Sequence, residues 1–439
     1  MKLTFKNYYR LVYSLVLLLL FLFWIVSTLS FAFSTSIGSP PDEMYHIKLS
    51  KLYGNVNTFI AQDTKDTIDL GIVSRTPNLY HLILGKTLVF PDYVPIILRI
   101  ENFLIGIIFF IFSITTINSH TSSRKIRILF LFLLSNIVML QYLFGAVSYD
   151  NFINLFALIS FYFLHKIIQN NDVKSFKWLI IISLLGVLVK FTYIPLLLVQ
   201  FSFICINYFK NGKLTILFKS LTNSKPLLLI LLLLSSIILY FYGLNLLRYG
   251  ALTPSCEQVM SSELCAQDPN TTIKNQIYLS EKINPNFSNM YAYGFSWLRL
   301  MLERTFGIFS HQSLLPYAEW ISFLTLFSLF SLGIIFKQIN NKYDYYLFFI
   351  SVFYTLILFI KNYNGFLLTG INAAAVQGRY IFPILFPLIY LFSKYYIKLF
   401  RNNKLLEFIF ILITVASVFS FGFLYFFNFE GMFSIFRNI

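Results

Sequence analysis

Long apolar runs recur along the whole chain, and they constrain the fold more than any other feature. The 439 residues are 57% hydrophobic and only 12% charged, and the mean hydropathy is +0.72. Soluble domains carry about twice that charged fraction. A helix needs about 20 apolar residues to cross a bilayer, and runs of about this length occur many times. The composition therefore predicts an all-α integral membrane protein.

The apolar runs predict about eleven membrane-spanning helices. The pair 178–189 and 191–209 is the least regular, because Lys190 and Pro195 interrupt it and twelve residues rise only about 18 Å. We interpret this pair as two crossings. The predicted spans are 11–33, 95–118, 126–146, 150–169, 178–189, 191–209, 226–247, 314–336, 344–361, 380–399 and 405–428.

Basic residues fall in alternate connections between these spans. The net charge of +16 would suggest nucleic acid in a soluble protein. Here the Lys and Arg residues concentrate in short loops, which is the orientation signal of membrane proteins, so we expect no nucleic-acid partner. The positive-inside rule predicts a cytoplasmic N-terminus and an extracytoplasmic C-terminus, and we expect a multi-pass protein of the inner (plasma) membrane.

Two long segments, 34–94 and 248–313, are external loops in this topology. Their charge is nearly balanced, unlike that of the basic loops. Cys256 and Cys265 lie together in the second segment, where an oxidising compartment would allow a disulfide, and the sequence leaves their pairing open. Zinc is not expected, because no further Cys or His ligands are nearby. We assign one polytopic domain, 1–439.

The stretch "SPPDEMYH" follows the first apolar run and is rich in groups that can do chemistry. Two prolines stiffen the exit from the run, and Asp42, Glu43 and His46 come next. Asp42 and His46 share a face if the segment is helical. A carboxylate beside an apolar surface is a candidate general base. The alternative is a plain helix start, with Asp42 as the cap and Glu43 favouring the helix dipole.

Further polar residues stand where other predicted spans begin or end at the outer face. Asp150 could be a helix cap, and Lys190 could extend harmlessly to the interface or bind phosphate. Arg379 is the one strongly basic residue of its outer loop, against the positive-inside trend, which favours a functional role. The candidate substrate-binding residues are His46, Arg75, Tyr149, Asp150, Lys190, Tyr193, Gln377, Arg379 and Tyr380.

These residues predict a polar cavity at the outer membrane boundary. Charged groups near a bilayer are costly unless they are paired or used. Carboxylates in such a cavity could act on a hydroxyl group, and cations could hold a phosphate.

Four motifs, "SPPDEMYH", "SYDNF", "KFTYIP" and "QGRYIFPILFP", together resemble domain-of-unknown-function family 2142. This is a family of bacterial polytopic membrane proteins related to the GT-C glycosyltransferases. The motifs are spread over most of the chain, and the first and last are the more specific. The resemblance implies a GT-C-like helical bundle with an acidic motif in the first external loop.

The resemblance also implies a reaction. GT-C enzymes transfer a sugar from a lipid-linked phosphate donor outside the cytoplasm. Carried over, Asp42 would be the catalytic base, Glu43 an alternate base or partner, and Lys190 and Arg379 would neutralise the lipid phosphate. The expected partners are a polyprenyl-phosphate-linked sugar donor, a glycan or lipid-linked acceptor, and the bilayer.

No cofactor is certain, and a divalent metal stays open. The segment 248–313 has no second acidic motif of recognisable spacing, which departs from the GT-C pattern. Three rival functions also stay open: a transporter or flippase of lipid-linked saccharides, a glycan polymerase or ligase, and a non-enzymatic assembly factor. A transporter would need charged residues inside the spans, where Arg99 and Glu101 are exceptions to mostly apolar middles.

Overall fold

The computed structural model is almost wholly helical over the residues that it describes. Its one strand pair joins β1 (Ile308–Phe309) to β2 (Ser313–Leu314), two residues each and antiparallel. The all-α class predicted from the sequence is therefore confirmed for this part of the chain. The described residues are 5–63, 67, 70–88, 93–222, 224–265, 290–309, 313–314, 327, 331–369 and 376–418.

Seven described helices are long and apolar enough to cross a membrane, and each coincides with a predicted span. The bent pair of α6 and α7 makes an eighth if it is one span. A multi-pass membrane protein is thus supported, but the count of eleven spans is not confirmed. The seven are α1 (Phe5–Ser34), α5 (Val94–His120), α8 (Asp150–Asn170), η2 with α10 (Phe191–Tyr193, Ile194–Lys210), α12 with η3 and α13 (Lys225–Ile238, Leu239–Gly243, Leu244–Tyr249), α19 (Lys342–Thr369), and η5 with α20 (Gly378–Ile384, Leu385–Leu399).

The predicted span 126–146 is a pair of helices with a bend between them. The chain forms α6 (Arg124–Ser135) and α7 (Val138–Phe144), which meet at 65°. The amide of Gln141 donates to the Ser135 carbonyl at 2.6 Å, so side-chain hydrogen bonding compensates for the broken helical ladder. All seven residues of α7 are buried, because the helix enters the core of the bundle.

Of the other predicted spans, 314–336 and 405–428 lie largely or partly outside the described residues. The described part of the last one is α21 (Lys404–Val418). The span 178–189 belongs to α9 (Val173–Val189), whose 17 residues rise about 25 Å.

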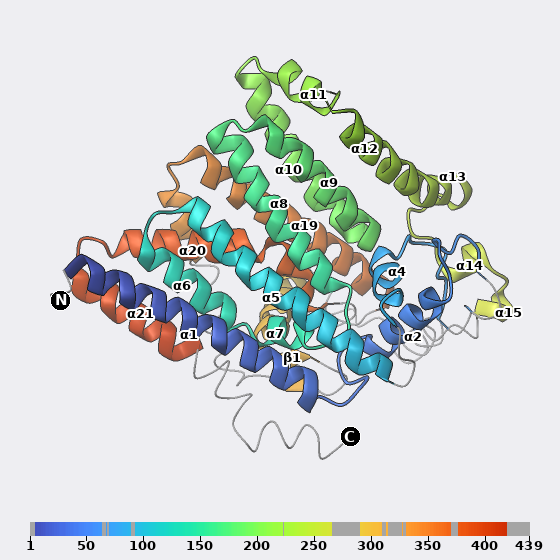
Figure 1. The fold of residues 1–439 in the computed structure, drawn as a ribbon, viewed down its shortest axis with the longest axis horizontal. Coiled ribbons are helices and arrows are strands. Elements are labelled where there is room, and N and C mark those ends of the chain that lie inside the picture. The colour runs from blue at the N-terminus through green and yellow to red at the C-terminus, as the bar shows by residue number, and fades with distance from the viewer. Residues whose placement is uncertain are drawn as a thin grey trace.

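Helices α9 and α10 run in opposite directions, as the two-crossing interpretation requires. The end of α8, which leads into α9, places Gln169 beside Asn341, and the far end of α10 places Asn207 within 2.6 Å of Lys342 Nζ. Both helix ends therefore reach the start of α19, while the break at Lys190 lies at the opposite end of the bundle. Figure 1 shows α8, α9 and α10 side by side.

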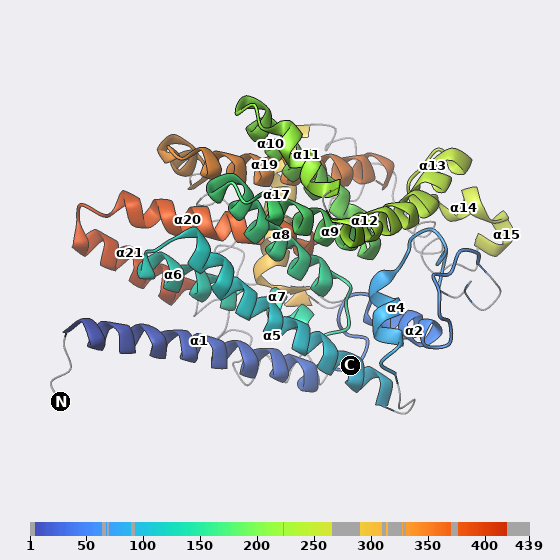
Figure 2. The same ribbon diagram turned by 45° about the horizontal axis from the view of Figure 1, so that its top comes forward.

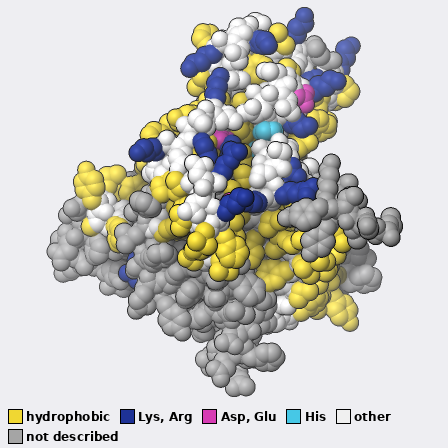
Figure 3. Space-filling model, turned by 90° about the vertical axis from the view of Figure 1, so that its left-hand side faces the viewer, with side chains coloured by type: hydrophobic (Ala, Val, Ile, Leu, Met, Phe, Trp, Pro, Cys, Tyr) yellow, Lys and Arg dark blue, Asp and Glu magenta, His cyan; other side chains and the backbone are white. Residues whose placement is uncertain are grey.

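The basic loops gather at one end of the molecule, which we call the basic end. Lys125 at the start of α6 contacts Glu407 of α21 at 2.5 Å, and His120 at the end of α5 bonds the Tyr343 hydroxyl at 2.7 Å. Lysine and arginine side chains are numerous on this face (Figure 3). The charge alternation read from the sequence thus corresponds to one physical face.

Helices α2 and α4 of the first long connecting segment and α14 and α15 of the second lie at the opposite end (Figures 1 and 2). In the first, helices α2 and α4 pack on each other. The second contains three described helices, and the longest of them, α17, packs against η5, α7 and α19. Short amphipathic α11 connects α10 to α12. The bounds are α2 (Glu43–Gly54), α4 (Leu79–Gly85), α11 (Leu214–Thr222), α14 (Cys256–Val259), α15 (Ser262–Cys265) and α17 (Met290–Phe306).

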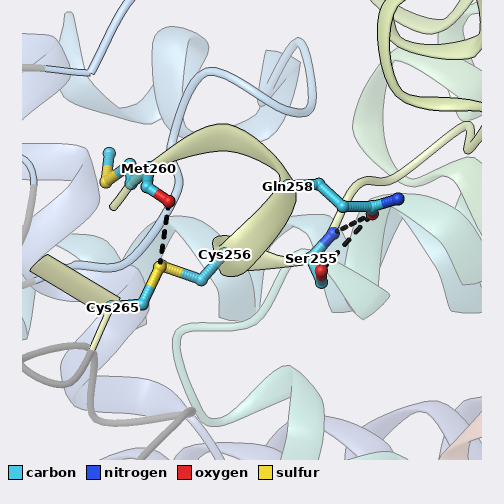
Figure 4. The surroundings of a disulfide bond; sticks show 5 residues. All are labelled: Ser255, Cys256, Gln258, Met260 and Cys265. Atoms are coloured by element: carbon cyan, nitrogen blue, oxygen red, sulfur yellow. Dashed lines mark hydrogen bonds between the residues drawn. A yellow bond between two sulfur atoms is a disulfide. The ribbon is translucent and has the colours of Figure 1, made fainter. Parts of the chain in front are cut away.

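Cys256 and Cys265 form a disulfide, with their Cα atoms 5.6 Å apart (Figure 4). The pairing that the sequence left open is therefore confirmed. Ser255 and Gln258 form a capping box at the start of α14, and both cysteines pack against Ile72 of the first segment. The bridge thus fixes a short piece of the second segment against the first.

Candidate functional site

Glu43 is buried in an ion pair that we call the Glu43 lock. Both of its carboxylate oxygens are bonded by Arg99 of α5, at 2.8 Å from Nε and 2.7 Å from Nη2. The backbone N–H groups of Gly38 and Val147 donate to the same two oxygens. The Glu43 side chain is 0% exposed, so it cannot reach an acceptor. The prediction of Glu43 as an alternate base is therefore wrong.

The lock joins three parts of the chain. Besides Glu43, Arg99 donates to the carbonyls of Ala32 at 2.9 Å, Thr35 at 2.6 Å and Ser36 at 3.1 Å. The Ala32 carbonyl is one of the groups that the end of α1 leaves without a helical partner, and Thr35 and Ser36 follow the helix directly. Arg99 thus closes the end of α1 and anchors the start of α2 at once. A charged residue near the start of an apolar span was the sequence signal for this role.

Asp42 lies at the N-cap position of α2, but its side chain makes no capping bond. Its φ of 62° is in the left-handed region, which raises the energy of a non-glycine residue by about 1 kcal/mol. The capping interpretation is therefore wrong. One oxygen, Oδ2, instead accepts from Nη2 of Arg379 at 2.5 Å, while the side chain stays 52% exposed. Within the described residues Oδ1 has no partner.

Asp150, Lys190 and Arg379 meet beside Asp42, and we call these four residues the rim cluster. Asp150 Oδ1 accepts from Lys190 Nζ at 2.8 Å, and its Oδ2 lies 3.4 Å from Arg379 Nε. Asp150 is the first residue of α8 and caps nothing with its side chain. The cap interpretation of Asp150 is therefore also wrong, because the carboxylate holds two cations that arrive from α9 and η5.

The two cations of the rim cluster are less free than the sequence suggested. The side chain of Arg379 is 1% exposed and that of Lys190 is 11% exposed. Arg379 therefore positions Asp42 and is closed to a lipid phosphate, which corrects its predicted role. Burial lowers the pKa of Lys190, but Asp150 and the neighbouring tyrosines raise it more, so the ammonium stays charged.

Aromatic rings enclose Lys190 on two sides. Its Nζ lies 4.3 Å from the ring centre of Tyr149 and 4.7 Å from that of Tyr380, within cation–π distance. The ring of His46 packs edge-to-face on Tyr149 at 4.5 Å. The structure thus brings together the two tyrosines and the histidine that the sequence proposed for substrate binding.

A second histidine, which the sequence gave no reason to select, bonds to His46. His46 Nδ1 lies 2.9 Å from His81 Nε2 of α4, and both rings are buried. Burial lowers the pKa of His46 well below its ordinary value, and the charges of Arg379 and Lys190 lower it further. Burial lowers the pKa of His81 in the same way, followed by the effect of His46. The pair is therefore neutral near pH 7.

The position of Arg379 depends on a glycine. Gly378 starts η5 where the backbone of Arg304 in α17 passes so close that an added Cβ would lie 2.2 Å from the carbonyl carbon of Arg304. Only glycine fits at this approach. The motif "QGRY" thus lets η5 pack against α17, which directs the next residue, Arg379, at Asp42 and Asp150.

Three predicted site residues lie outside this arrangement. Tyr193 is fully buried, and its ring packs on Gly186 of α9, so it has a packing role. Gln377 precedes η5, with its Oε1 buried and unpaired within the described residues. Arg75 lies in the first segment and lines a separate pocket with α13.

Lys361 of α19 is a further residue that was not selected from the sequence. Its Nζ lies 5.0 Å from the ring centre of Phe191, the residue after Lys190, and the two lysines are close enough to repel each other. The lysine is exposed and has no ion pair in the described part of the chain. The sequence feature that could have identified Lys361 is a single charged residue near the end of an apolar span.

Comparison with known proteins adds no relative. No family model, no curated protein and no solved structure matches this chain. The resemblance to domain-of-unknown-function family 2142 therefore remains an interpretation of the four motifs. The described residues also contain no group of three or more His, Cys, Asp or Glu side chains arranged to hold a metal ion.

Proposed function

We propose that the protein is a GT-C-type membrane glycosyltransferase. It transfers a sugar from a polyprenyl-phosphate donor to a cell-envelope glycan or a lipid-linked saccharide at the extracytoplasmic face. The observation that carries the proposal is the state of Asp42. Its carboxylate is half exposed, fixed through one oxygen by a buried arginine, and open to solvent through the other.

Asp42 acts as the general base in this reaction. Its Oδ1 accepts the proton of the acceptor hydroxyl as that oxygen forms a bond to the anomeric carbon of the donor sugar. The bond from the anomeric carbon to the phosphate oxygen breaks, and the phosphate leaves with the electron pair. A single displacement of this kind inverts the anomeric carbon. Arg379 holds the carboxylate in place during the transfer.

Lys361 and Lys190 supply the charge that the leaving phosphate needs. The rim cluster alone pairs two carboxylates with two cations, so it is neutral. Lys361 adds a third cation without a carboxylate, which leaves a net positive site next to the membrane. An ammonium that is exposed on an apolar helix near a bilayer surface is well placed to meet a lipid phosphate. A preorganised cation of this kind stabilises the transition state by several kcal/mol.

In the proposed orientation the protein lies in the inner membrane, with its basic end in the cytoplasm and the rim cluster outside. We expect an introduced cysteine at exposed Asn57, in a Cys205→Ser background, to react with an impermeant thiol reagent on intact cells. A cysteine at exposed Asn211, at the basic end, should react only after lysis. Labelling of the second position from outside would reverse the orientation.

Transfer by the purified full-length chain tests the proposal. The donors are polyprenyl-phosphate hexoses and pentoses with a radiolabelled sugar, and the acceptors are envelope glycan fractions. We expect Asp42→Asn to lower the rate about 100- to 10,000-fold. Lys361→Gln should raise KM for the donor about tenfold or more, because it removes a charged contact. Asp172→Asn is the matched control, since Asp172 caps α9 at the basic end and asparagine caps equally well.

Each rival function has its own outcome in this experiment. Movement of the lipid-linked sugar across the membrane without transfer would favour a transporter or flippase. Transfer of only long saccharides would favour a polymerase or ligase. Near-normal transfer by folded Asp42→Asn protein would remove Asp42 as the base.

A further inference from the structure

A pocket separate from the rim cluster opens between the first external segment and the outer end of the span that α12 begins. Its cavity volume is about 60 Å³, and it is open to solvent. The enclosed part is therefore small, and a ligand larger than an oxyanion group would extend out of its mouth. Its polar and aromatic lining includes Ser74, Arg75, Tyr240, Asn245, Arg248 and Tyr249.

Two arginines line this pocket without an acidic partner. Within the described residues, neither Arg75 nor Arg248 takes part in an ion pair. Five ion pairs between other described residues use the carboxylates of Glu43, Asp150, Asp344 and Asp42. Arg75 is half-buried and Arg248 is exposed. Two unpaired guanidinium groups on one cavity make it attractive to an anion.

The walls of the pocket are fixed by cross-links between segments. Asn245 of α13 donates to the backbone carbonyl of Arg75 at 3.0 Å and to that of Leu252 at 3.1 Å. The Cys256–Cys265 disulfide packs on Ile72, which also lines the pocket. Three separate parts of the chain are therefore held together around this space, so the pocket is a built feature.

A π-helical turn, η3, shapes the remaining wall. It interrupts the helix between α12 and α13, and it carries two aromatic lining residues, Tyr240 and Phe241. Tyr240 is 52% exposed, while Phe241 packs on Phe59 of the first segment. Single π turns inside α-helices occur frequently at functional sites. The turn leaves one ring exposed beside the two arginines.

We propose that this pocket binds a saccharide that carries an oxyanion, a carboxylate or a phosphate, as the acceptor of the reaction. The acceptor assignment rests on the proposed function. Each arginine offers a planar fork that matches an oxyanion. The exposed ring of Tyr240 offers a flat apolar face to the sugar ring.

Tyr45 is half-buried, and both Arg75 of the pocket and Asp42 of the rim cluster lie within electrostatic reach of its hydroxyl. In the proposed complex, a saccharide anchored at the arginines reaches past Tyr45 to Asp42. The donor phosphate, in contrast, is assigned to Lys361, so the two substrates have different cation sites.

Calorimetric titration of the purified full-length chain in detergent tests the proposal without any transfer reaction. The probes are a glucuronic-acid-containing tetrasaccharide, glucose 1-phosphate, inorganic phosphate and neutral maltotetraose. We expect the tetrasaccharide or the sugar phosphate to bind at least tenfold more tightly than the neutral sugar and than inorganic phosphate. The tighter of the two anionic probes identifies the oxyanion.

Charge-removing variants separate the pocket from non-specific attraction. Arg75→Gln and Arg248→Gln should each weaken binding of that probe at least tenfold. Arg401→Gln, an exposed arginine at the basic end, should leave it unchanged. Asp42→Asn should also bind the probe normally, even though its transfer activity is lost. The proposal would be overturned if the two pocket variants bound the anionic probe as tightly as the wild type does. It would also be overturned if maltotetraose or inorganic phosphate bound to the wild type as tightly as that probe.

The two proposals fail in different ways. Absence of sugar transfer, with intact and arginine-dependent binding, would remove the proposed reaction but keep the saccharide pocket. Normal transfer by Arg75→Gln and Arg248→Gln with unchanged acceptor KM would remove the pocket but keep the reaction.

Discussion

The Glu43 lock and the rim cluster begin at adjacent residues, and the chain uses them in opposite ways. In the lock, both oxygens of Glu43 are saturated by Arg99 and two backbone N–H groups, and no water reaches them. In the rim cluster, Asp42 uses one oxygen for Arg379 and leaves the other to solvent. The two carboxylates differ in access and in the number of free lone pairs.

This difference in burial and hydrogen bonding distinguishes a structural carboxylate from one that is available for catalysis. A buried charge that loses its partner is strongly destabilising, so Glu43 is committed to the fold. A half-exposed ion pair contributes little to stability, so Asp42 is available for another role. Its left-handed backbone also points to function, because the conformation gains no capping bond in return.

The largest expected effect comes from opening the lock. Glu43→Gln leaves the guanidinium of Arg99 buried without its counter-charge, which should lower the free energy of unfolding by about 3–5 kcal/mol. Thermal unfolding of the detergent-solubilised protein, followed by size-exclusion chromatography, measures this loss. The double variant Glu43→Leu with Arg99→Met should recover part of it, because no unpaired charge remains. An unchanged unfolding temperature in Glu43→Gln would show that the lock is not structural.

A smaller effect is expected from acidification of the histidine pair beside the rim cluster. Burial holds the pKa of His46 and His81 below the ordinary value, so the unfolded chain takes up protons below about pH 6.5 while the folded chain does not. This contribution to stability is present above that pH and is lost as the pH falls. Between pH 7.5 and 5.5 each histidine should lower the free energy of unfolding by about 1.4 kcal/mol.

Unfolding temperatures at the two pH values measure the acid effect. The double variant His46→Gln with His81→Gln should lose less stability on acidification than the wild type. Lys190 and Arg379 do not titrate in this range, and in the folded protein their charges oppose protonation of His46. An equal loss in the two proteins would show that other groups carry the acid sensitivity.

The smallest effect on stability is expected for the rim residue Asp42. Asp42→Asn should change the free energy of unfolding by less than about 1 kcal/mol, because the pair with Arg379 is half exposed. The same thermal assay measures it next to Glu43→Gln. A loss as large as that of Glu43→Gln would mean that Asp42 is a second structural anchor, and it would weaken the case for a base.

Much of the fold was predictable from hydropathy alone. Each of the seven described helices that are long and apolar enough to cross a membrane coincides with a predicted apolar run, because a bilayer selects helices by length and apolar content. The break between α6 and α7 was not predictable. It depends on side-chain amides such as that of Gln141 and on the burial of α7 among other helices, which hydropathy does not record.

The site was predictable as a set of charges but not as a set of partners. Asp42, Asp150, Lys190 and Arg379 were selected because charged residues at span ends are costly unless paired or used. Which residue pairs with which was not predictable. The partners come from α2, α8, α9 and η5, and their contacts span as many as 337 positions in the chain. Lys361 and His81 were missed because their neighbours are close only in space.

Hydropathy, charge and local motifs were enough to predict the membrane class, the apolar spans, the alternation of basic loops and the acidic motif after the first span. These properties follow from composition and from short-range order along the chain. The sealed state of Glu43 and the open state of Asp42 become visible only in the folded chain, because they depend on Arg99 and Arg379 arriving from distant helices. Burial and hydrogen-bond partners, which set the cost and the reactivity of a charge, are properties of the packed molecule.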